Sequence, residues 1–186
     1  GSTFSYPIGA SNDTEGFAAL GTQNLPAPTV TTPSDYFKTV LYEGDGVAIG
    51  AGGLEVTGVG FEPDFVWIKD RNATMNHRVF DVVRGEGGKY LETDSTLAEG
   101  TSAEMLSTFD TDGFTLGSNV SVNTDDDDYV AWCMKAGGAA TTTSPAGTIA
   151  STSSVADHGG FSIVKYDPGS GGSPGDTVGH GLSVIP

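Results

Sequence analysis

Two short apolar runs bounded by charged residues constrain the fold of this chain more than any other feature. They are Asp64-Phe-Val-Trp-Ile-Lys-Asp70 and Asp128-Tyr-Val-Ala-Trp-Cys-Met-Lys135. Runs of this length, rich in aromatic and β-branched residues, are typical of central β-strands that are covered on both faces. We therefore expect their tryptophans, Trp67 and Trp132, to anchor a core.

Further strand-like segments alternate with turn residues around these runs. Asp110-Thr-Asp-Gly113 separates two of them, and an Asp-Gly step between strands is a strong hairpin signal. The chain has 28 glycines, which favour turns over helices. About ten short strands with turns between them predict an all-β fold, an antiparallel β-sandwich of the jelly-roll or concanavalin-like kind. The additional segments cover residues 77–83, 89–93, 106–109 and 114–116.

The chain also repeats one of its own motifs. Phe37-Lys-Thr-Val-Leu-Tyr42 precedes a Gly-rich stretch and Gly58-Val-Gly60, and Phe161-Ser-Ile-Val-Lys-Tyr166 precedes a similar stretch and Gly179-His-Gly181. The two Phe anchors and the two Tyr anchors are each 124 residues apart (161 − 37 and 166 − 42). Self-similarity at a fixed period is typical of modules in an array. The repeat predicts that this chain is part of a longer series of tandem β-modules.

Composition along the chain predicts four regions. Residues 1–34 are expected to be the end of an upstream module and a Pro-rich linker, 35–138 one β-sandwich module, 139–159 an Ala/Thr/Ser connector, and 160–186 the beginning of a second copy. In the first region Pro26, Pro28 and Pro33 favour extended backbone. The connector is a low-complexity segment in which one strand is the most structure we expect.

The charge of the chain excludes several classes of partner. Eight basic residues against 24 acidic ones give a net charge of −16. Such a field repels nucleic acid and anionic membrane surfaces, so we expect no nucleic-acid partner. No apolar run approaches the length of a membrane span, so no membrane insertion is expected either. High negative charge does suit a protein that stays soluble at high local density.

Residue types that carry catalysis are present without a catalytic spacing. The three histidines, His77, His158 and His180, form neither a metal pair nor a triad, and each is expected at a turn or strand end. The single cysteine, Cys133, is interpreted as a buried hydrophobe rather than a reactive thiol. Acids are so numerous that no pair is singled out for glycoside hydrolysis. We therefore predict a protein that is not an enzyme.

Two acidic segments raise a calcium hypothesis. Asp110-Thr-Asp-Gly113 lacks the later carboxylates of a complete calcium loop, and a hairpin turn is the favoured interpretation. Asp125, Asp126, Asp127 and Asp128 place four carboxylates in one loop, where they repel one another unless a cation or solvent screens them. A solvated rim loop is favoured for these four, and calcium, which prefers carboxylate oxygens, is the alternative. No other cofactor is predicted.

Four elements follow one another along the chain: Gly58-Val-Gly-Phe-Glu-Pro-Asp-Phe-Val-Trp-Ile-Lys-Asp-Arg71, Val79-Phe-Asp-Val-Val-Arg-Gly85, Leu106-Ser-Thr-Phe-Asp-Thr-Asp-Gly-Phe-Thr-Leu-Gly117 and Tyr129-Val-Ala-Trp-Cys-Met-Lys-Ala-Gly-Gly138. Together they resemble a module of phage tail-fibre, spike and other virion appendage proteins. A shorter segment, Gly16-Phe-Ala-Ala-Leu-Gly-Thr-Gln-Asn-Leu-Pro26, is similar to the end of a SPRY-like β-sandwich upstream of such modules. The chain departs from the pattern at Met134, where a second aromatic is expected, and in its acidic loop.

The resemblance implies a structural part of a virion surface appendage that spaces or displays host-recognition elements. It also implies association with other virion proteins and with copies of the chain itself, as a homo-oligomer in which a trimer is expected. One alternative is a carbohydrate-binding or adhesion module of a bacterial surface protein, with a host glycan held by loop aromatics such as Tyr42, Tyr90 or Tyr166. A polysaccharide-degrading enzyme is a third possibility that an assay on host envelope would test.

Overall fold

The structure is a computed structural model that describes residues 32–140, 147–167, 169 and 173–182. The upstream SPRY-like segment and most of the Pro-rich linker lie outside these residues. Two short 3-10 helices, Pro33–Asp35 and Ile49–Ala51, accompany the strands. The strands are β1 (Phe37–Glu43), β2 (Leu54–Val56), β3 (Phe65–Asp70), β4 (Arg78–Asp81), β5 (Lys89–Glu92), β6 (Gly100–Thr101), β7 (Leu106–Asp110), β8 (Gly113–Leu116), β9 (Asp128–Met134), β10 (Ser151–Val155) and β11 (Ser162–Tyr166).

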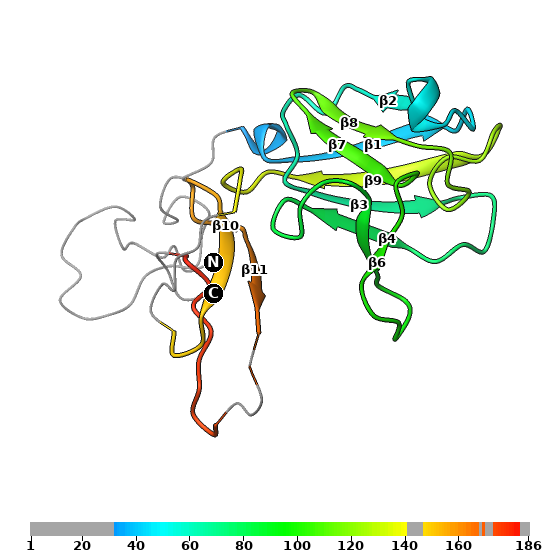
Figure 1. The fold of residues 1–186 in the computed structure, drawn as a ribbon. Helices are drawn as coiled ribbons and strands as arrows, with labels where there is room; N and C mark the ends of the chain where they lie inside the picture. The colour runs from blue at the N-terminus through cyan, green and yellow to red at the C-terminus, as the bar shows by residue number, and fades with distance from the viewer. Residues whose placement is uncertain (1–31, 141–146, 168, 170–172, 183–186) are drawn as a thin grey trace, which may run out of the picture. The chain divides into compact units, whose positions relative to one another are not determined.

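Nine of these strands form two antiparallel sheets that pack as a sandwich. The larger sheet has the order β1-β9-β3-β4-β5-β6, and the smaller has the order β2-β8-β7. Figure 1 shows the smaller sheet lying as a separate layer over β1, β9 and β3. Every strand pair within the two sheets is antiparallel. The predicted all-β antiparallel sandwich is therefore confirmed, whereas tandem repetition of the module stays a prediction.

The core lies between the two sheets and takes every second residue of the central strands β3 and β9. On β9, Tyr129, Ala131 and Cys133 point inward and are fully buried, as Val66 and Ile68 do on β3. This alternation follows from the period of two that a strand imposes on its side chains. The buried core cluster consists of Val40, Val56, Val59, Phe61, Val66, Ile68, Phe80, Met105, Leu106, Phe109, Phe114, Leu116, Val122, Tyr129, Ala131 and Cys133.

The prediction that the two tryptophans anchor the core is wrong. Trp67 and Trp132 lie opposite each other on β3 and β9, and both are only partly buried. Their rings contact each other at 5.1 Å between centroids on the outward face of the large sheet. The reason is register: small and branched neighbours occupy the inward positions, so the indoles take the opposite face.

The hairpin predicted at Asp110-Thr-Asp-Gly113 is confirmed as the turn between β7 and β8. Asp110 pairs with Gly113, and Phe109 pairs with Phe114 beside them. Gly113 is needed for close approach, because a Cβ there would lie 1.8 Å from the carbonyl oxygen of Val56.

The predicted connector and the start of the second copy meet in one hairpin. β10 and β11 pair antiparallel, so the boundary predicted at residue 159 falls in the turn between them. Contacts between the hairpin and the rest of the described structure include the bond from Gly137 N–H to Ser154 Oγ at 2.9 Å, the edge-on packing of Phe161 against Phe65 at 6.0 Å, and that of His158 against Tyr36 at 4.0 Å. The two motifs of the repeat therefore have different partners, because β1 pairs with β9 and β11 pairs with β10.

Candidate functional site

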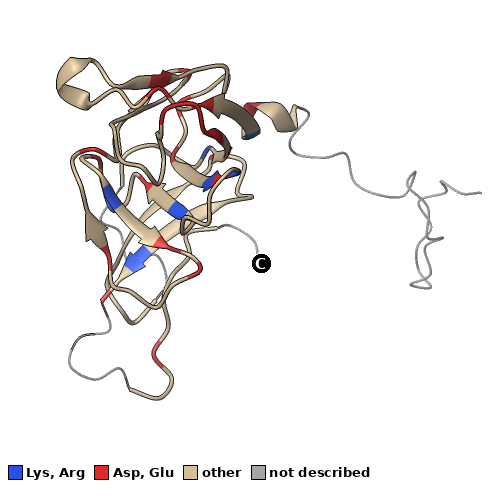
Figure 2. Cartoon of the chain, turned by 90° about the vertical axis from the view of Figure 1, so that its right-hand side faces the viewer, with Lys and Arg blue, Asp and Glu red and all other residues tan. Residues whose placement is uncertain are grey.

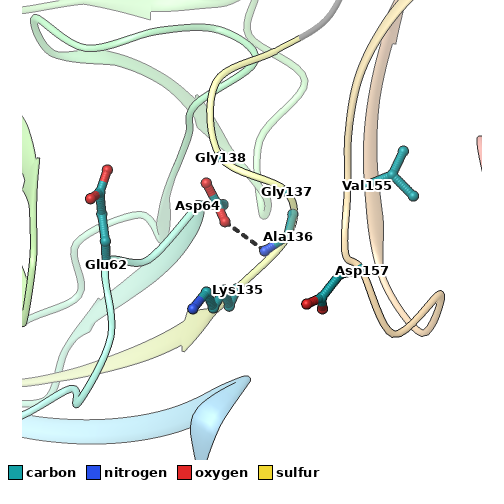
Figure 3. Close-up of a pocket in the computed structure, with 8 residues that line it drawn as sticks. All are labelled: Glu62, Asp64, Lys135, Ala136, Gly137, Gly138, Val155 and Asp157. Carbon is teal, nitrogen blue, oxygen red and sulfur yellow. Dashed lines mark hydrogen bonds between the residues drawn. The ribbon is translucent and has the colours of Figure 1, made fainter. Parts of the chain in front are cut away.

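A pocket of about 500 Å³ lies where β3 begins, β9 ends and the β10–β11 hairpin approaches. Three carboxylates and one lysine contribute its charged groups. Figure 3 shows the carboxylates of Glu62 and Asp157 on opposite sides of Asp64, which points toward the segment after β9. The lining residues are Glu62, Asp64, Lys135, Ala136, Gly137, Gly138, Val155 and Asp157.

Asp64 is the buried acid of this pocket, with 2% of its surface exposed. Its Oδ2 accepts a hydrogen bond from Ala136 N–H at 2.7 Å, and its backbone bonds to Met134 and Val82 on the neighbouring chain segments. Desolvation raises the pKa of the Asp64 carboxyl, against a smaller lowering by the amides of Ala136 and Gly138. Asp64 therefore joins the ends of three strand segments, because its Oδ2 and both of its backbone groups bond to the backbone of neighbouring segments.

The pocket carboxylates do not form a shared chemical centre. Among the described residues, no group of three or more His, Cys, Asp or Glu side chains lies close enough to hold a metal ion. A glycosidase needs two carboxylates that face one substrate bond across a set distance. Here Asp64 already accepts from the backbone, and Glu62 and Asp157 lie to either side of it. The arrangement fits a structural junction better than a reaction centre.

Four further acids bind backbone amides in the same way. Each places one carboxylate at a turn and accepts from two N–H groups, which satisfies donors that no strand partner reaches. Sequence reasoning missed this role because an acid beside a strand was interpreted as a boundary charge. The bonds run from Asn72 and Ala73 to Asp70 (both 2.8 Å), from Val83 and Arg84 to Asp81 (3.0 and 2.8 Å), from Ile49 and Ser118 to Glu104 (3.0 and 2.9 Å), and from Gly58 and Gly60 to Asp112 (3.2 and 2.5 Å).

The four aspartates proposed for calcium follow one another around the turn that leads into β9, whose first residue is Asp128. Asp126 N–H donates to Gly44 C=O at 3.1 Å, and Asp127 C=O accepts from Gly44 N–H at 2.8 Å. Asp126 has a positive φ of 64°, and Asp128 pairs with Arg71 at 3.8 Å. Backbone bonds to Gly44 therefore shape this loop, and the structure does not bring Asp125, Asp126, Asp127 and Asp128 together around one point. Calcium binding there stays a prediction.

The histidines lie at turns or strand ends. The Nδ1 atoms of His158 and His180 accept from the backbone N–H two residues further on, at 2.8 and 3.0 Å. His77 precedes β4 and packs against Trp67 at 5.9 Å between ring centroids. The three imidazole rings therefore have different neighbours in the described structure.

The tyrosines proposed for glycan contact have different environments. Tyr42 is partly buried against the core, stacks on Tyr129 at 5.1 Å, and donates its hydroxyl to Val122 C=O at 2.9 Å. Tyr90 packs against the core beneath the guanidinium of Arg78, which lies 4.7 Å from its ring centre. Tyr166 differs from both, because 54% of its surface is exposed.

Charge is distributed unevenly between strands and loops. Figure 2 shows many of the Asp and Glu residues in loops and at strand ends. Five of the eight basic residues lie within strands, namely Lys38, Lys69, Arg78, Lys89 and Lys165. Arg78 is almost buried, and it pairs with Glu92 and donates to Ser121 Oγ at 3.0 Å. None of the described helices is long and apolar enough to cross a membrane.

These features define an antiparallel β-sandwich module whose turns are held by carboxylates. A family model described as "Domain of unknown function (DUF7483)" matches residues 32–186, which is most of the chain. The chain belongs to this family. In the corresponding comparisons, no curated protein and no solved structure matches it.

Proposed function

We propose that this chain is a structural module of a phage virion appendage, such as a tail fibre, spike or head fibre. In this role it is not an enzyme: it spaces or displays host-recognition elements at the virion surface and associates with other virion proteins. The resemblance of its four ordered elements to virion appendage modules supports the assignment. The internal repeat also supports it, because self-similarity at a fixed period is typical of modules in an array, which is what a spacer in a fibre or spike requires.

The observation that best supports the proposal is that carboxylate side chains hold the loops of the sandwich by accepting hydrogen bonds from backbone N–H groups. Asp64, Asp70, Asp81, Glu104 and Asp112 each accept backbone N–H groups, so five acids stabilise loops of the sandwich. Loops are normally the mobile, variable part of a fold that carries binding and catalysis. Loops fixed at this many points favour a module that keeps a constant geometry, which is what a spacer or display element requires.

Purified phage particles provide the test. Antibody raised against residues 32–186 should label the appendages of intact particles in immunogold electron microscopy, and mass spectrometry of the particles should recover peptides of the chain. Antibody against a cytoplasmic host protein serves as the control. Particles that lack both label and peptides, from a lysate in which the protein is abundant, would contradict the virion assignment.

A carbohydrate-binding or adhesion module is the second candidate. The observation that favours it is the partly exposed pair Trp67 and Trp132, with His77 beside it, because apolar sugar faces stack on such rings. A glycan array probed with the wild type and with Trp132→Ala separates the candidates. Binding that the substitution removes favours the sugar-binding function, whereas an array without signal favours the structural function.

A further inference from the structure

The outward face of the large sheet is apolar, although one face of an antiparallel sheet in water is normally polar. Because side chains alternate along a strand, the odd-numbered residues of β1 and β3 and the even-numbered residues of β9 share this face. We name the following six residues the outer apolar face: Phe37, Leu41, Trp67, Val130, Trp132 and Met134.

The outer apolar face is exposed along β1, whereas Phe65, which lies in the row of Met134, packs against Phe161 of the β10–β11 hairpin. Phe37 and Leu41, on the edge strand β1, are 46% and 66% exposed, and the other four residues are partly buried. Leu41 lies opposite Val130, and Trp132 lies between Thr39 and Trp67, so the exposed and half-buried side chains are contiguous. A contiguous apolar patch that stays exposed on a soluble protein is a candidate interaction site.

Charge indicates which partner fits this face. The chain carries a net charge of −16, so two copies repel each other across most of their surfaces. The rows of the outer apolar face contain no exposed carboxylate: Asp81 continues the row of Met134 and Phe65 on β4, but it is buried and pairs with Arg84. Glu43 and Asp128 lie at one end of the face, and Lys69, which shares its rows, donates to Ala73 C=O at 3.0 Å. A second copy can therefore approach across this face without placing acid against acid.

The rim of the face is complementary to itself. Glu43 and Asp128 lie opposite each other at the ends of β1 and β9, and Arg71 pairs with Asp128 at 3.8 Å. These groups are exposed and include both signs of charge. In a two-fold arrangement, the same patch of each subunit meets its copy, so Arg71 of one chain can face Glu43 of the other.

We propose that the outer apolar face binds a second copy of this chain to form a two-fold dimer. Three strands about 4.8 Å apart, with five residues rising about 3.4 Å each, give a flat footprint of roughly 250 Å². A standard stable interface buries about 800 Å² per partner. The dimer is therefore weak and depends on concentration, which suits copies held close together in an assembly.

The test compares two substitutions of equal chemistry in the full chain. Leu41→Glu places a charge in the face, and Leu97→Glu places one on an equally exposed leucine outside it, since Leu97 is 68% exposed in the loop between β5 and β6. Sedimentation velocity from about 10 μM to about 1 mM should show wild-type mass rising from one chain toward two. Leu41→Glu should weaken the association at least about tenfold, and Leu97→Glu should leave it unchanged.

Tryptophan emission gives a second readout, because both tryptophans of the chain lie on this face. Emission should shift to the blue with concentration in the wild type and in Leu97→Glu, but not in Leu41→Glu. A monomer at every concentration would overturn the proposal, as would association that Leu41→Glu leaves intact. A blue shift with added oligosaccharide and no change in mass would assign the face to a sugar instead. These outcomes do not depend on whether the chain is found in virions.

Discussion

Cys133, the single cysteine of the chain, is fully buried on the inward side of β9. Because burial raises the pKa of its thiol to about 12, the reactive thiolate is scarce near neutral pH. We expect a chromogenic disulfide reagent to leave the native protein unmodified and to label one thiol per chain in denaturant. The absorbance of the released thiolate measures this, and rapid labelling of native protein would show that the thiol is accessible.

Asp64 should make the stability of the fold depend on pH. Its pKa is raised above the ordinary aspartate value of 3.8, so the folded chain binds a proton more tightly than the unfolded chain does. Between the unfolded and folded pKa values the native state holds more protons, and the free energy of unfolding therefore falls as pH rises through that window. Below the unfolded pKa the stabilising effect is fully present.

Urea denaturation of the wild type and of Asp64→Asn across acidic pH isolates this effect. The wild type should lose stability relative to Asp64→Asn as pH rises from about 3.8 through the folded pKa. Glu104 has the opposite effect on the pH dependence of stability, and it has it in both proteins, because the amides of Ser118 and Ile49 lower its pKa. Parallel profiles for the two proteins would mean that burial of Asp64 carries no ionisation penalty.

At the scale of elements, the sequence predicts strands better than it predicts their faces. The run from Asp64 to Asp70 is β3 almost to the residue, and the Asp-Gly step is the predicted turn. The run is apolar at nearly every position, however, so its pattern does not say which side chains point inward. Packing between the sheets decides this, and it places Val66 and Ile68 inside and Trp67 outside.

Asp112 connects two elements that are distant in sequence. Its carboxylate, in the β7–β8 turn, accepts from Gly58 and Gly60 N–H in the segment after β2. We expect Asp112→Ala to lower the free energy of unfolding by about 1 kcal/mol, because these donors then have only water as a partner. Asp112→Asn keeps one acceptor oxygen and should lose about half as much in denaturant titrations. Equal loss in both variants would mean that charge, rather than acceptor geometry, holds the turn.

The acidic loop before β9 allows a direct test of the calcium hypothesis. Since its four aspartates do not converge in the described structure, we expect the melting temperature to be the same in chelator and in millimolar calcium. Asp126→Gly, at the residue with φ of 64°, should be neutral or slightly stabilising, because glycine adopts this conformation without strain. A calcium-dependent rise in melting temperature that Asp126→Asn and Asp127→Asn abolish would establish a site.

At the scale of the whole molecule, the net charge of −16 should make stability depend on salt. Repulsion between acids opposes the compact state, and the Debye length falls from about 30 Å at 0.01 M to about 8 Å at 0.15 M salt. We expect the melting temperature to rise with sodium chloride over this range. A variant with Asp125, Asp126 and Asp127 changed to Asn should respond less. A melting temperature that falls with salt would instead indicate that ion pairs such as Arg78–Glu92 dominate.

Chain organisation was harder to predict at this scale than fold class. Composition and turn residues identify an all-β sandwich, because these depend on local preferences. The pairing of β10 with β11 depends instead on a partner strand of Ser and Thr residues, Ser151–Val155, whose composition is that of a linker. The junction at Asp64 was also missed, because it forms only when segments 72 residues apart in the chain meet.

The first and last strands of the sandwich lie next to each other, and this has a mechanical consequence. Phe37 is paired with Met134, and just beyond them Lys135 N–H donates to Tyr36 C=O at 2.9 Å. The chain therefore enters and leaves the module at adjacent points. Because antiparallel hydrogen bonds run perpendicular to their strands, tension applied through these two points would open the β1–β9 pair one bond at a time. The folded module would therefore add little to the length of an array. Under tension, the β1–β9 pair would separate first.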